Sequence, residues 1–316
     1  MAIHLHVTLA ALCLAFVASQ AALPGEVYWN SLLPNTTSMP RAISNVLLPG
    51  KGEEIVPDLR RSGDVVVPDL RREKYKRWNH YAHGADKNEV VLVVNPPSAP
   101  WFLEKDLYPG REMEMEIARP ENNNGYTFIP RQVADSIPFS SDKFPAILNQ
   151  LSMKPESPKA ELMKETLKEC ELPAEEGEVK TCATSLESMI DFSIQQLGKN
   201  IQAVSTEAEK DTKLQKFTML KGMEQIGNYK DEAVACHKQN YAYAVFYCHV
   251  VKGARAYVVP FVGTSSGTKV KAVGICHTNT TAWSPEHVAF KILKVKPGGE
   301  PICHFFPEYN ILWTRK

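Results

Sequence analysis

Four copies of the dipeptide Cys-His mark the last third of this chain of 316 residues. They begin at Cys236, Cys248, Cys276 and Cys303, with 10, 26 and 25 residues between successive copies. The whole sequence holds only seven cysteines and nine histidines, and four of each stand side by side in these dipeptides. Cysteines form disulfides or bind metals as thiolates, and neutral imidazole is the commonest metal ligand. The repeat therefore indicates a site at which disulfides or metal ligands are concentrated.

The second dipeptide lies in Ala-Val-Phe-Tyr-Cys-His-Val-Val, a run that is typical of a β-strand. Successive side chains of a strand point to opposite faces of the sheet. The Cys and His of one dipeptide therefore cannot serve the same cluster without a local kink. We expect the cysteines to form disulfides and the histidines to form a metal or acid–base site. These histidines are His237, His249, His277 and His304.

Residues 1–22 contain no Lys, Arg, Asp or Glu and end in small residues after an apolar run. This pattern predicts a secretory signal peptide, and the alternative is a short N-terminal membrane anchor. No later segment is long and apolar enough to span a bilayer. We therefore expect an exported protein that has no membrane partner once the signal is removed.

Export would place the six cysteines that follow Cys13 in an oxidising compartment, where up to three disulfides can form. Cys170 and Cys182 are close in sequence and lie outside the dipeptide repeat, so we expect them to pair. The connectivity of the other four stays open, and a zinc site of four thiolates is a weaker alternative. Two glycosylation sequons begin at Asn35 and Asn279. The 36 basic and 36 acidic residues balance, which gives no indication of a nucleic-acid partner.

The spacing of the dipeptides, followed eight residues later by Trp313, resembles the plant BURP domain. The resemblance extends over residues 101–110, 129–141, 182–192 and 236–249, and it is strongest to the dehydration-responsive branch of that family. It implies a single BURP-type domain over residues 101–316, preceded by the signal at 1–22 and a variable segment at 23–100.

The variable segment contains a repeat, Val56-Pro-Asp-Leu-Arg-Arg61 and Val67-Pro-Asp-Leu-Arg-Arg72. Residues 50–90 are rich in charge and poor in aromatic residues, so they cannot bury enough apolar surface to order themselves. We expect a flexible linker here, and a segment for wall binding or processing is the alternative.

Hydrophobic patterns predict an α+β domain. Strands are expected at 90–94 and around Met113–Ile117, and short helices at 141–151 and 157–170. A capping box at Thr184–Glu187 predicts a helix that ends at Gly198. Further strands are expected at 243–251, 254–262, 269–276 and 290–295. No ten-residue helix is expected between them, so this C-terminal β region should be largely antiparallel. Tyr241, Tyr243, Tyr247 and Trp313 are expected to be core residues.

Imidazole ligands suit copper or zinc, and the alternative is that the four histidines merely form hydrogen bonds beside disulfides. The family resemblance favours copper, because some BURP proteins are copper-dependent cyclases that crosslink a core peptide of their own chain through Tyr or Trp. The repeat in this chain contains neither Tyr nor Trp, although Tyr126 lies in a segment that is a candidate core peptide.

The sequence thus predicts an exported plant protein of the stress and development programme with a copper site at its histidines. We expect it to act in the cell wall, apoplast or vacuole, with a cell-wall component or a peptide as partner. A copper-dependent autocatalytic peptide cyclase is the alternative, and the sequence does not decide whether the protein is an enzyme.

Overall fold

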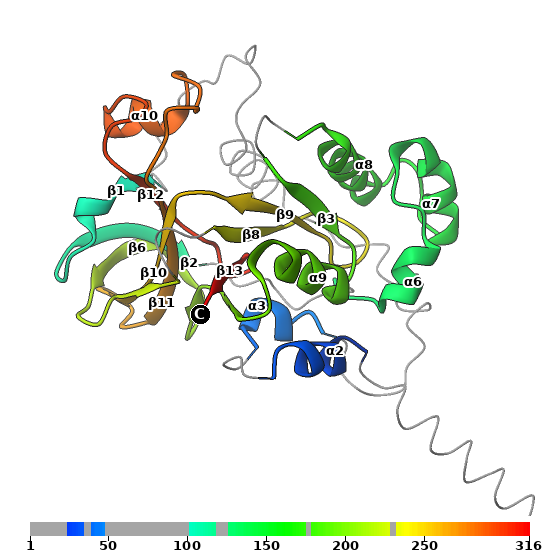
Figure 1. The fold of residues 1–316 in the computed structure, drawn as a ribbon, viewed down its shortest axis with the longest axis horizontal. Helices are drawn as coiled ribbons and strands as arrows, with labels where there is room; N and C mark the ends of the chain where they lie inside the picture. Colours follow the sequence, from blue (N-terminus) through cyan, green and yellow to red (C-terminus); the bar gives the residue numbers. More distant parts are fainter. Residues whose placement is uncertain (1–23, 35–38, 48–100, 118–125, 175–177, 228–231) are drawn as a thin grey trace, which may run out of the picture.

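The computed structural model describes residues 24–34, 39–47, 101–117, 126–174, 178–227 and 232–316. These ranges form helices and two antiparallel sheets, so the predicted α+β class is confirmed (Figure 1). The predicted signal peptide, the hexapeptide repeat, the expected flexible linker and the expected strand at 90–94 lie outside the described residues.

The larger sheet has the strand order β1-β12-β11-β10-β6-β2, with β5 beside β11 and β7 beside β10. Every strand pair in it is antiparallel. In β2 the side chains of Met113 and Met115 are half-buried between exposed glutamates, as the alternation predicted. The strands are β1 Trp101–Leu103, β2 Glu112–Ile117, β5 Glu207–Ala208, β6 Thr212–Met219, β7 Glu224–Ile226, β10 Ala254–Gly263, β11 Lys269–His277 and β12 Ile302–Phe305.

The smaller sheet has the strand order β3-β9-β8-β13-β4 and is also antiparallel throughout. Its central strands are buried on both faces, which is consistent with their nearly continuous apolar sequences. The strands are β3 Lys180–Ala183, β4 Ile201–Val204, β8 Ala233–Lys238, β9 Phe246–Val251 and β13 Ile311–Arg315.

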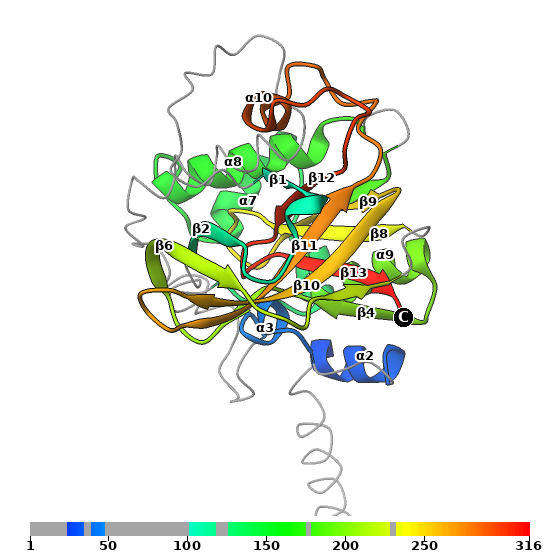
Figure 2. The same ribbon diagram turned by 90° about the vertical axis from the view of Figure 1, so that its left-hand side faces the viewer.

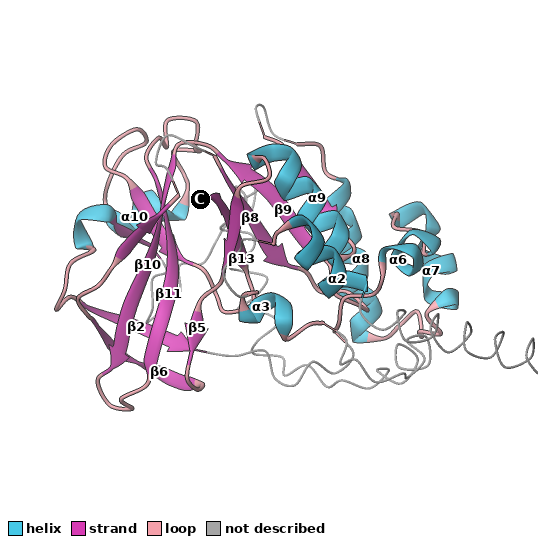
Figure 3. Ribbon diagram, turned by 60° about the horizontal axis from the view of Figure 1, so that its bottom comes forward, coloured by secondary structure: helices cyan, strands magenta, loops and turns pink. Residues whose placement is uncertain are grey.

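Most helices gather on the side of the smaller sheet that faces away from the larger one (Figure 3). The helix α10 lies apart from them, beside β1 of the larger sheet (Figure 1). None of the helices in the described ranges has the length and apolar character needed to cross a membrane. The helices are α2 Pro24–Leu32, α3 Arg41–Ser44, α6 Arg131–Ser136, α7 Phe144–Gln150, α8 Pro158–Glu171, α9 Leu186–Leu197 and α10 Val288–Leu293, with 3₁₀ turns η1 Glu104–Asp106 and η2 Ser141–Lys143.

The two sheets share an apolar layer to which both contribute buried side chains. Ala235 and Leu312 come from the smaller sheet, whereas Val273 and Ile275 come from the larger one. The chain crosses between the sheets after β2, β4, β7, β9 and β12 (Figure 2). Two of these crossings adjoin Cys-His dipeptides, so the junction of the sheets is where the repeated motif is assembled.

The residues ahead of the BURP-like region contribute to the core of the smaller sheet. Trp29 of α2 is only 3% exposed, and its ring lies 5.5 Å from that of Trp313. Ile43 of α3 is fully buried in the same cluster. The Tyr28 hydroxyl donates a hydrogen bond of 2.5 Å to Asp191 of α9. Residues 24–34 and 39–47 thus pack as an integral layer, with Trp313 as their anchor.

The start of α9 differs by one residue from the prediction. Ser185 caps this helix, because its hydroxyl accepts a hydrogen bond of 3.1 Å from the Ser188 amide. The predicted box of Thr184 and Glu187 is therefore wrong, although the helix itself ends at Gly198 as expected. Glu187 instead accepts a hydrogen bond from the Arg131 amide at the start of α6. Thr184 and Ser185 both carry a hydroxyl group that could cap the helix. The helix begins after Ser185, and in that register Glu187 contacts Arg131.

The expected strand at 290–295 is also wrong, because residues 288–293 form α10. His287 caps this helix, since its Nδ1 accepts a hydrogen bond of 3.2 Å from the Ala289 amide. Ala289 and Phe290 are buried in a cluster with Trp101. Composition alone cannot separate a short apolar helix from a strand, and here the cap and the packing decide.

Candidate functional site

The sheet register places the repeated cysteines directly opposite each other. Cys236 of β8 pairs with Cys248 of β9, and Cys276 of β11 pairs with Cys303 of β12. Each pair forms a disulfide whose Cα atoms are 4.0 Å apart. These two bridges supply the connectivity that the sequence left open. The third disulfide joins Cys170 to Cys182, the pair expected from the sequence.

The histidines of β8 and β9 point to the other face of the sheet and meet diagonally. His237 is opposite Tyr247 in the register, and His249 is opposite Ala235. The two imidazoles therefore share one face, two residues out of step, and their Nε2 atoms are 3.4 Å apart. We call His237 and His249 the first pair.

The same arrangement recurs on β11 and β12. His277 is opposite Ile302 and His304 is opposite Ile275, which again makes the two histidines diagonal neighbours. Their Nε2 atoms are also 3.4 Å apart. We call His277 and His304 the second pair. Two ribbons in different sheets thus build the same combination of a disulfide on one face and an imidazole pair on the other.

Both pairs face the junction between the sheets, and Phe306 connects them. Its ring centroid lies 5.7 Å from that of His237 and 5.4 Å from that of His304. Phe306 belongs to the short crossing from β12 to β13. The structure therefore brings all four predicted histidines to one region, where they form two pairs. The ring of Phe306 contacts one histidine of each pair.

The four imidazoles do not form one four-nitrogen centre. Within the described ranges no three side chains of His, Cys, Asp or Glu are grouped so that they could hold a single metal ion. Each pair nevertheless offers two nitrogens 3.4 Å apart. Since metal–imidazole bonds are about 2.0–2.1 Å long, this separation allows both nitrogens of a pair to bind one ion. The donor set thus fits copper as two separate two-nitrogen sites.

Burial keeps three of these imidazoles, those of His249, His277 and His304, neutral at ordinary pH. It lowers the pKa of His249 to about 4, although the charge of Glu178 opposes the shift. Burial also lowers the pKa of His304 to about 4. The pKa of His277 lies well below its usual value, because of burial and then of the neighbouring His304. The neutral form is the one that a metal ion requires of an imidazole ligand.

The first pair has polar neighbours. The Tyr247 hydroxyl donates a hydrogen bond of 3.0 Å to Glu178 Oε1, which lies 3.9 Å from His249 Nδ1. On the other side, the Asn310 amide nitrogen is 3.0 Å from His237 Nδ1. A carboxylate and an amide thus adjoin the outer nitrogens of the two rings.

The second pair has aromatic neighbours instead. Trp101 of β1 meets His304 edge to face, with ring centroids 5.0 Å apart. Trp283 meets His277 in the same way at 4.9 Å. His287 lies against both indoles, at 5.3 and 4.6 Å. The two pairs therefore share a backbone geometry but differ in chemical surroundings.

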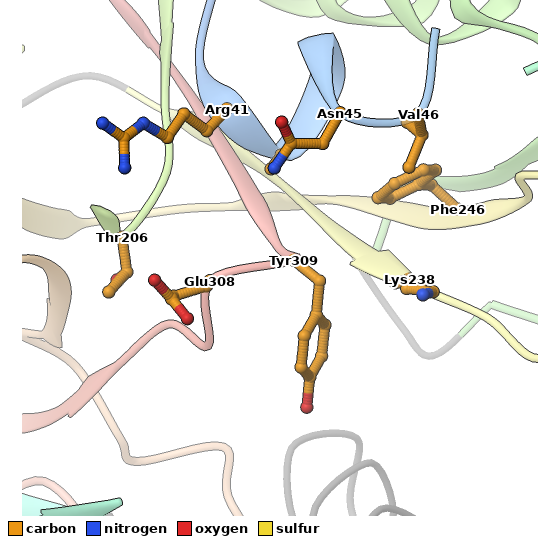
Figure 4. Close-up of a pocket in the computed structure, with 9 residues that line it drawn as sticks. Arg41, Asn45, Val46, Thr206, Lys238, Phe246, Glu308 and Tyr309 are labelled. Atoms are coloured by element: carbon orange, nitrogen blue, oxygen red, sulfur yellow. The ribbon is translucent and has the colours of Figure 1, made fainter. Parts of the chain in front are cut away.

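A small cavity lies on the opposite side of β8, and Figure 4 shows its lining. Its volume of about 20 Å³ is enough for roughly one water molecule. Lys238 contributes to it, and burial lowers the pKa of this lysine to about 8. The Lys238 ammonium is 3.9 Å from the centroid of the Tyr126 ring. The cavity is too small for an organic substrate, so it does not compete with the histidine pairs as a functional site.

The remaining predicted residues divide into three groups. Asn279 is exposed and its side-chain oxygen accepts a hydrogen bond from Thr281, whereas Asn35 lies outside the described residues. Tyr126 donates a hydrogen bond of 2.9 Å to the Val245 carbonyl, so its hydroxyl is engaged within the fold. Tyr241, Tyr243, Tyr247 and Trp313 are buried, as expected of core residues.

Sequence reasoning missed the residues that surround the pairs, namely Glu178, Asn310, Phe306, Trp101, Trp283 and His287. They come from segments far apart in the chain, and single residues of these types carry no distinctive signal. The crossing from β12 to β13 supplies two of them, Phe306 and Asn310.

Comparison with known proteins agrees with the resemblance seen in the sequence. The BURP domain family matches residues 100–315. BURP domain protein RD22 of Arabidopsis thaliana is 45% identical over 239 residues, which cover 74% of this chain and 60% of that protein. BURP domain-containing protein 5 of Oryza sativa subsp. japonica is 39% identical over 304 residues, covering 94% of this chain and 89% of that protein.

Protein RAFTIN 1A of Triticum aestivum is 40% identical over 217 residues, which cover 68% of this chain and 55% of that protein. This chain spans about 60% of RD22 and about 53% of BURP domain-containing protein 3 of Oryza sativa subsp. japonica, so these relatives contain additional sequence. The match covers all four Cys-His dipeptides and Trp313. The chain belongs to the plant BURP-domain family, in the branch that contains RD22.

Proposed function

We propose that this BURP protein is exported and binds copper at its two histidine pairs, and that it acts in the cell wall, apoplast or vacuole during stress and development. The observation that carries the proposal is the repeated geometry of one buried and one half-buried imidazole with Nε2 atoms 3.4 Å apart. Its partner would be a cell-wall component or a peptide.

Export is supported by the three disulfides. Such bonds form and persist in oxidising compartments and are rare in the cytosol. The apolar residues 1–22 have the composition of a signal peptide. Both features agree with a protein that leaves the cytosol before its cysteines pair.

Copper is supported by the donor chemistry of the pairs. Imidazole suits copper, and the cysteines are engaged in disulfides and so do not offer thiolate ligands. When bound, copper would supply one-electron chemistry. The chain's own residues hold the imidazoles in register, and burial keeps those of His249, His277 and His304 neutral. Zinc suits the same ligands, so a test must include both ions.

At saturating Cu(II), we expect the purified mature protein to bind copper at both pairs. Replacement His249→Ala removes one nitrogen of the first pair, and His304→Ala removes one of the second. Each variant should therefore lose about half of the bound copper, because an ion held by a single imidazole binds more weakly. Equilibrium dialysis followed by metal analysis measures the copper content, and parallel samples with Zn(II) compare the two ions.

The matched control is His83→Ala, which removes a histidine outside the Cys-His repeat. Its copper content should equal that of the unmodified protein. If His249→Ala and His304→Ala fold normally and still bind as much copper as this control, the histidine pairs are not the copper ligands.

The same purified protein can also be tested for crosslinking of its own chain, the reaction of an autocatalytic cyclase. Incubation with Cu(II) and oxygen, followed by intact-mass and peptide analysis, would reveal a loss of two hydrogens for each crosslink. An unchanged mass while copper is bound excludes the autocatalytic cyclase and leaves the copper-binding proposal in place.

Exposure of Asn279 leads to a separate expectation for the exported protein. The Asn279-Thr-Thr sequon is accessible, so we expect it to carry a glycan in a plant secretory system. Asn279→Gln should lower the mass of the secreted protein by one glycan. Equal masses of the two proteins after secretion would contradict the expectation, and enzymatic deglycosylation of both provides the control.

A further inference from the structure

Residues 24–34 and 39–47, which we call the N-terminal layer, have no covalent link to the sheets except the backbone. The sequence contains no cysteine between Cys13 and Cys170. The three disulfides all join cysteines within the range 170–303. The layer therefore keeps its place through non-covalent contacts and through the chain that follows it.

The layer places five apolar side chains in the core of the smaller sheet. They share one cluster with Trp313 of β13 and Leu186 of α9, which are both fully buried. Side chains that are removed completely from water usually dominate the affinity of an interface. The layer thus carries the anchors of a ligand, and these are Trp29, Leu33, Ala42, Ile43 and Val46.

Polar contacts at both helices of the layer fix its register on this surface. The Tyr28 hydroxyl of α2 donates a hydrogen bond of 2.5 Å to Asp191, which also accepts one of 2.6 Å from Arg131. The Arg131 guanidinium lies 5.2 Å from the centroid of the Tyr28 ring. The Arg41 guanidinium of α3 donates a hydrogen bond of 3.0 Å to the Ala208 carbonyl. The layer is therefore held in one orientation by both sheets.

The helix α3 depends on contacts with the rest of the protein. It has only four residues, and Pro40 before it supplies no side-chain cap. The Ala42 amide instead donates to the Ser205 hydroxyl at 3.4 Å, and the Val46 carbonyl accepts a hydrogen bond of 2.7 Å from the Phe128 amide. A helix of this length is unstable in water on its own. This part of the layer therefore takes its shape on the surface, as a peptide does that folds when it binds.

The layer fits the surface closely. The small cavity shown in Figure 4 lies between the two, with Arg41 and Asn45 of the layer on one side and Glu308 and Tyr309 on the other. Its volume of about 20 Å³ is enough for roughly one water molecule. Apolar anchors, polar contacts and close packing thus occur together, as they do at specific interfaces between separate chains.

We propose that the surface under the N-terminal layer is a peptide-binding site whose ligand is the chain's own residues 24–47. The layer then stays bound when the backbone is cut between residues 47 and 101, and the protein becomes a non-covalent complex of two chains. A free peptide of residues 24–47 can exchange with the bound layer. This inference goes beyond the proposed copper binding and does not depend on it.

The first experiment uses the whole mature chain, in which the recognition sequence of a site-specific protease replaces Val67–Arg72. After cleavage, size-exclusion chromatography at micromolar protein concentration is followed by mass analysis of the peaks. We expect both fragments in a single peak, and separate peaks in denaturant confirm that the cut is complete. Elution of the N-terminal fragment on its own under native conditions overturns the proposal.

The second experiment adds a fluorescently labelled peptide of residues 24–47 to the cleaved protein and measures its anisotropy. We expect binding, and displacement by the unlabelled peptide. A Trp29→Ala peptide should need a concentration about a hundredfold higher or more, because a large buried aromatic anchor is lost. A Val27→Ala peptide is the matched control, since Val27 is 63% exposed, and should compete as well as the unmodified peptide.

Both changes are made in the peptide, so the folding of the protein does not affect the comparison. Equal competition by the Trp29→Ala and Val27→Ala peptides overturns the assignment of the anchors. Co-elution of the fragments without any uptake of the labelled peptide overturns the exchangeable ligand, because the layer would then be trapped in the fold.

Discussion

Acidification of the metal-free protein from pH 7 to pH 4 is expected to lower its free energy of unfolding by several kcal/mol. Burial lowers the pKa of His249 and of His304 to about 4, from an unfolded value of 6.5. Between these values the unfolded chain binds protons that the folded protein excludes. Stability is therefore fully present above pH 6.5 and is lost as the pH falls towards 4. Each imidazole contributes about 3 kcal/mol to this loss.

Urea unfolding at a series of pH values measures the effect, and His249→Gln isolates it. This variant removes one of the buried imidazoles, so its stability should fall less steeply between pH 6.5 and 4 than that of the unmodified protein. Carboxylates also titrate at the acid end of this range, but they are common to both proteins and cancel in the difference. Identical pH profiles for the two proteins would show that the histidine does not remain neutral in the fold.

Replacement Trp29→Ala is expected to lower the free energy of unfolding by about 3–5 kcal/mol, the usual cost of removing a buried large aromatic side chain. Trp29 is 3% exposed and its ring lies 5.5 Å from that of the fully buried Trp313. The effect is informative because Trp29 precedes the BURP region at 100–315. Urea unfolding at neutral pH measures it, and the double variant Trp29→Ala with Trp313→Ala measures the coupling of the two rings.

Val27→Ala in the same helix is the matched control, since Val27 is 63% exposed. Surface substitutions of this kind usually change stability by no more than about 0.5 kcal/mol. A cost for Trp29→Ala as small as that for Val27→Ala would mean that α2 does not contribute to the stability of the folded protein. In that case the layer formed by residues 24–34 and 39–47 would be dispensable for folding.

The alternation of side chains along a strand was sufficient to predict the division between cysteines and histidines. It correctly placed Cys248 and His249 on opposite faces, and the sequence pattern gave the strands that carry the second and third dipeptides nearly in full, but not β8, which carries the first. It could not give the pairing of the four cysteines, because that depends on which strands are neighbours and in what register. The same missing information concealed the fact that the histidines meet as two pairs.

The surroundings of the pairs could not be predicted for a different reason. Asn310 and Phe306 act through their place in a crossing between sheets, and Glu178 and Trp101 reach the pairs from distant parts of the chain. Nothing in the local sequence distinguishes these residues from others of their type. For the same reason the apolar run that forms α10 was taken for a strand, since its cap His287 and its packing on Trp101 are tertiary features.

The direct opposition of the cysteines also affects the unfolded chain. The bridge between Cys236 and Cys248 spans only 12 positions, and that between Cys276 and Cys303 spans 27. The two histidines next to each bridge therefore stay tethered at high effective concentration after the sheets have melted. If the proposed copper binding holds, copper would then bind the oxidised denatured ensemble as well as the native state, which would reduce the net stabilisation by mass action. The affinity of copper for the folded protein and the protection against heat that copper provides would thus be separate properties.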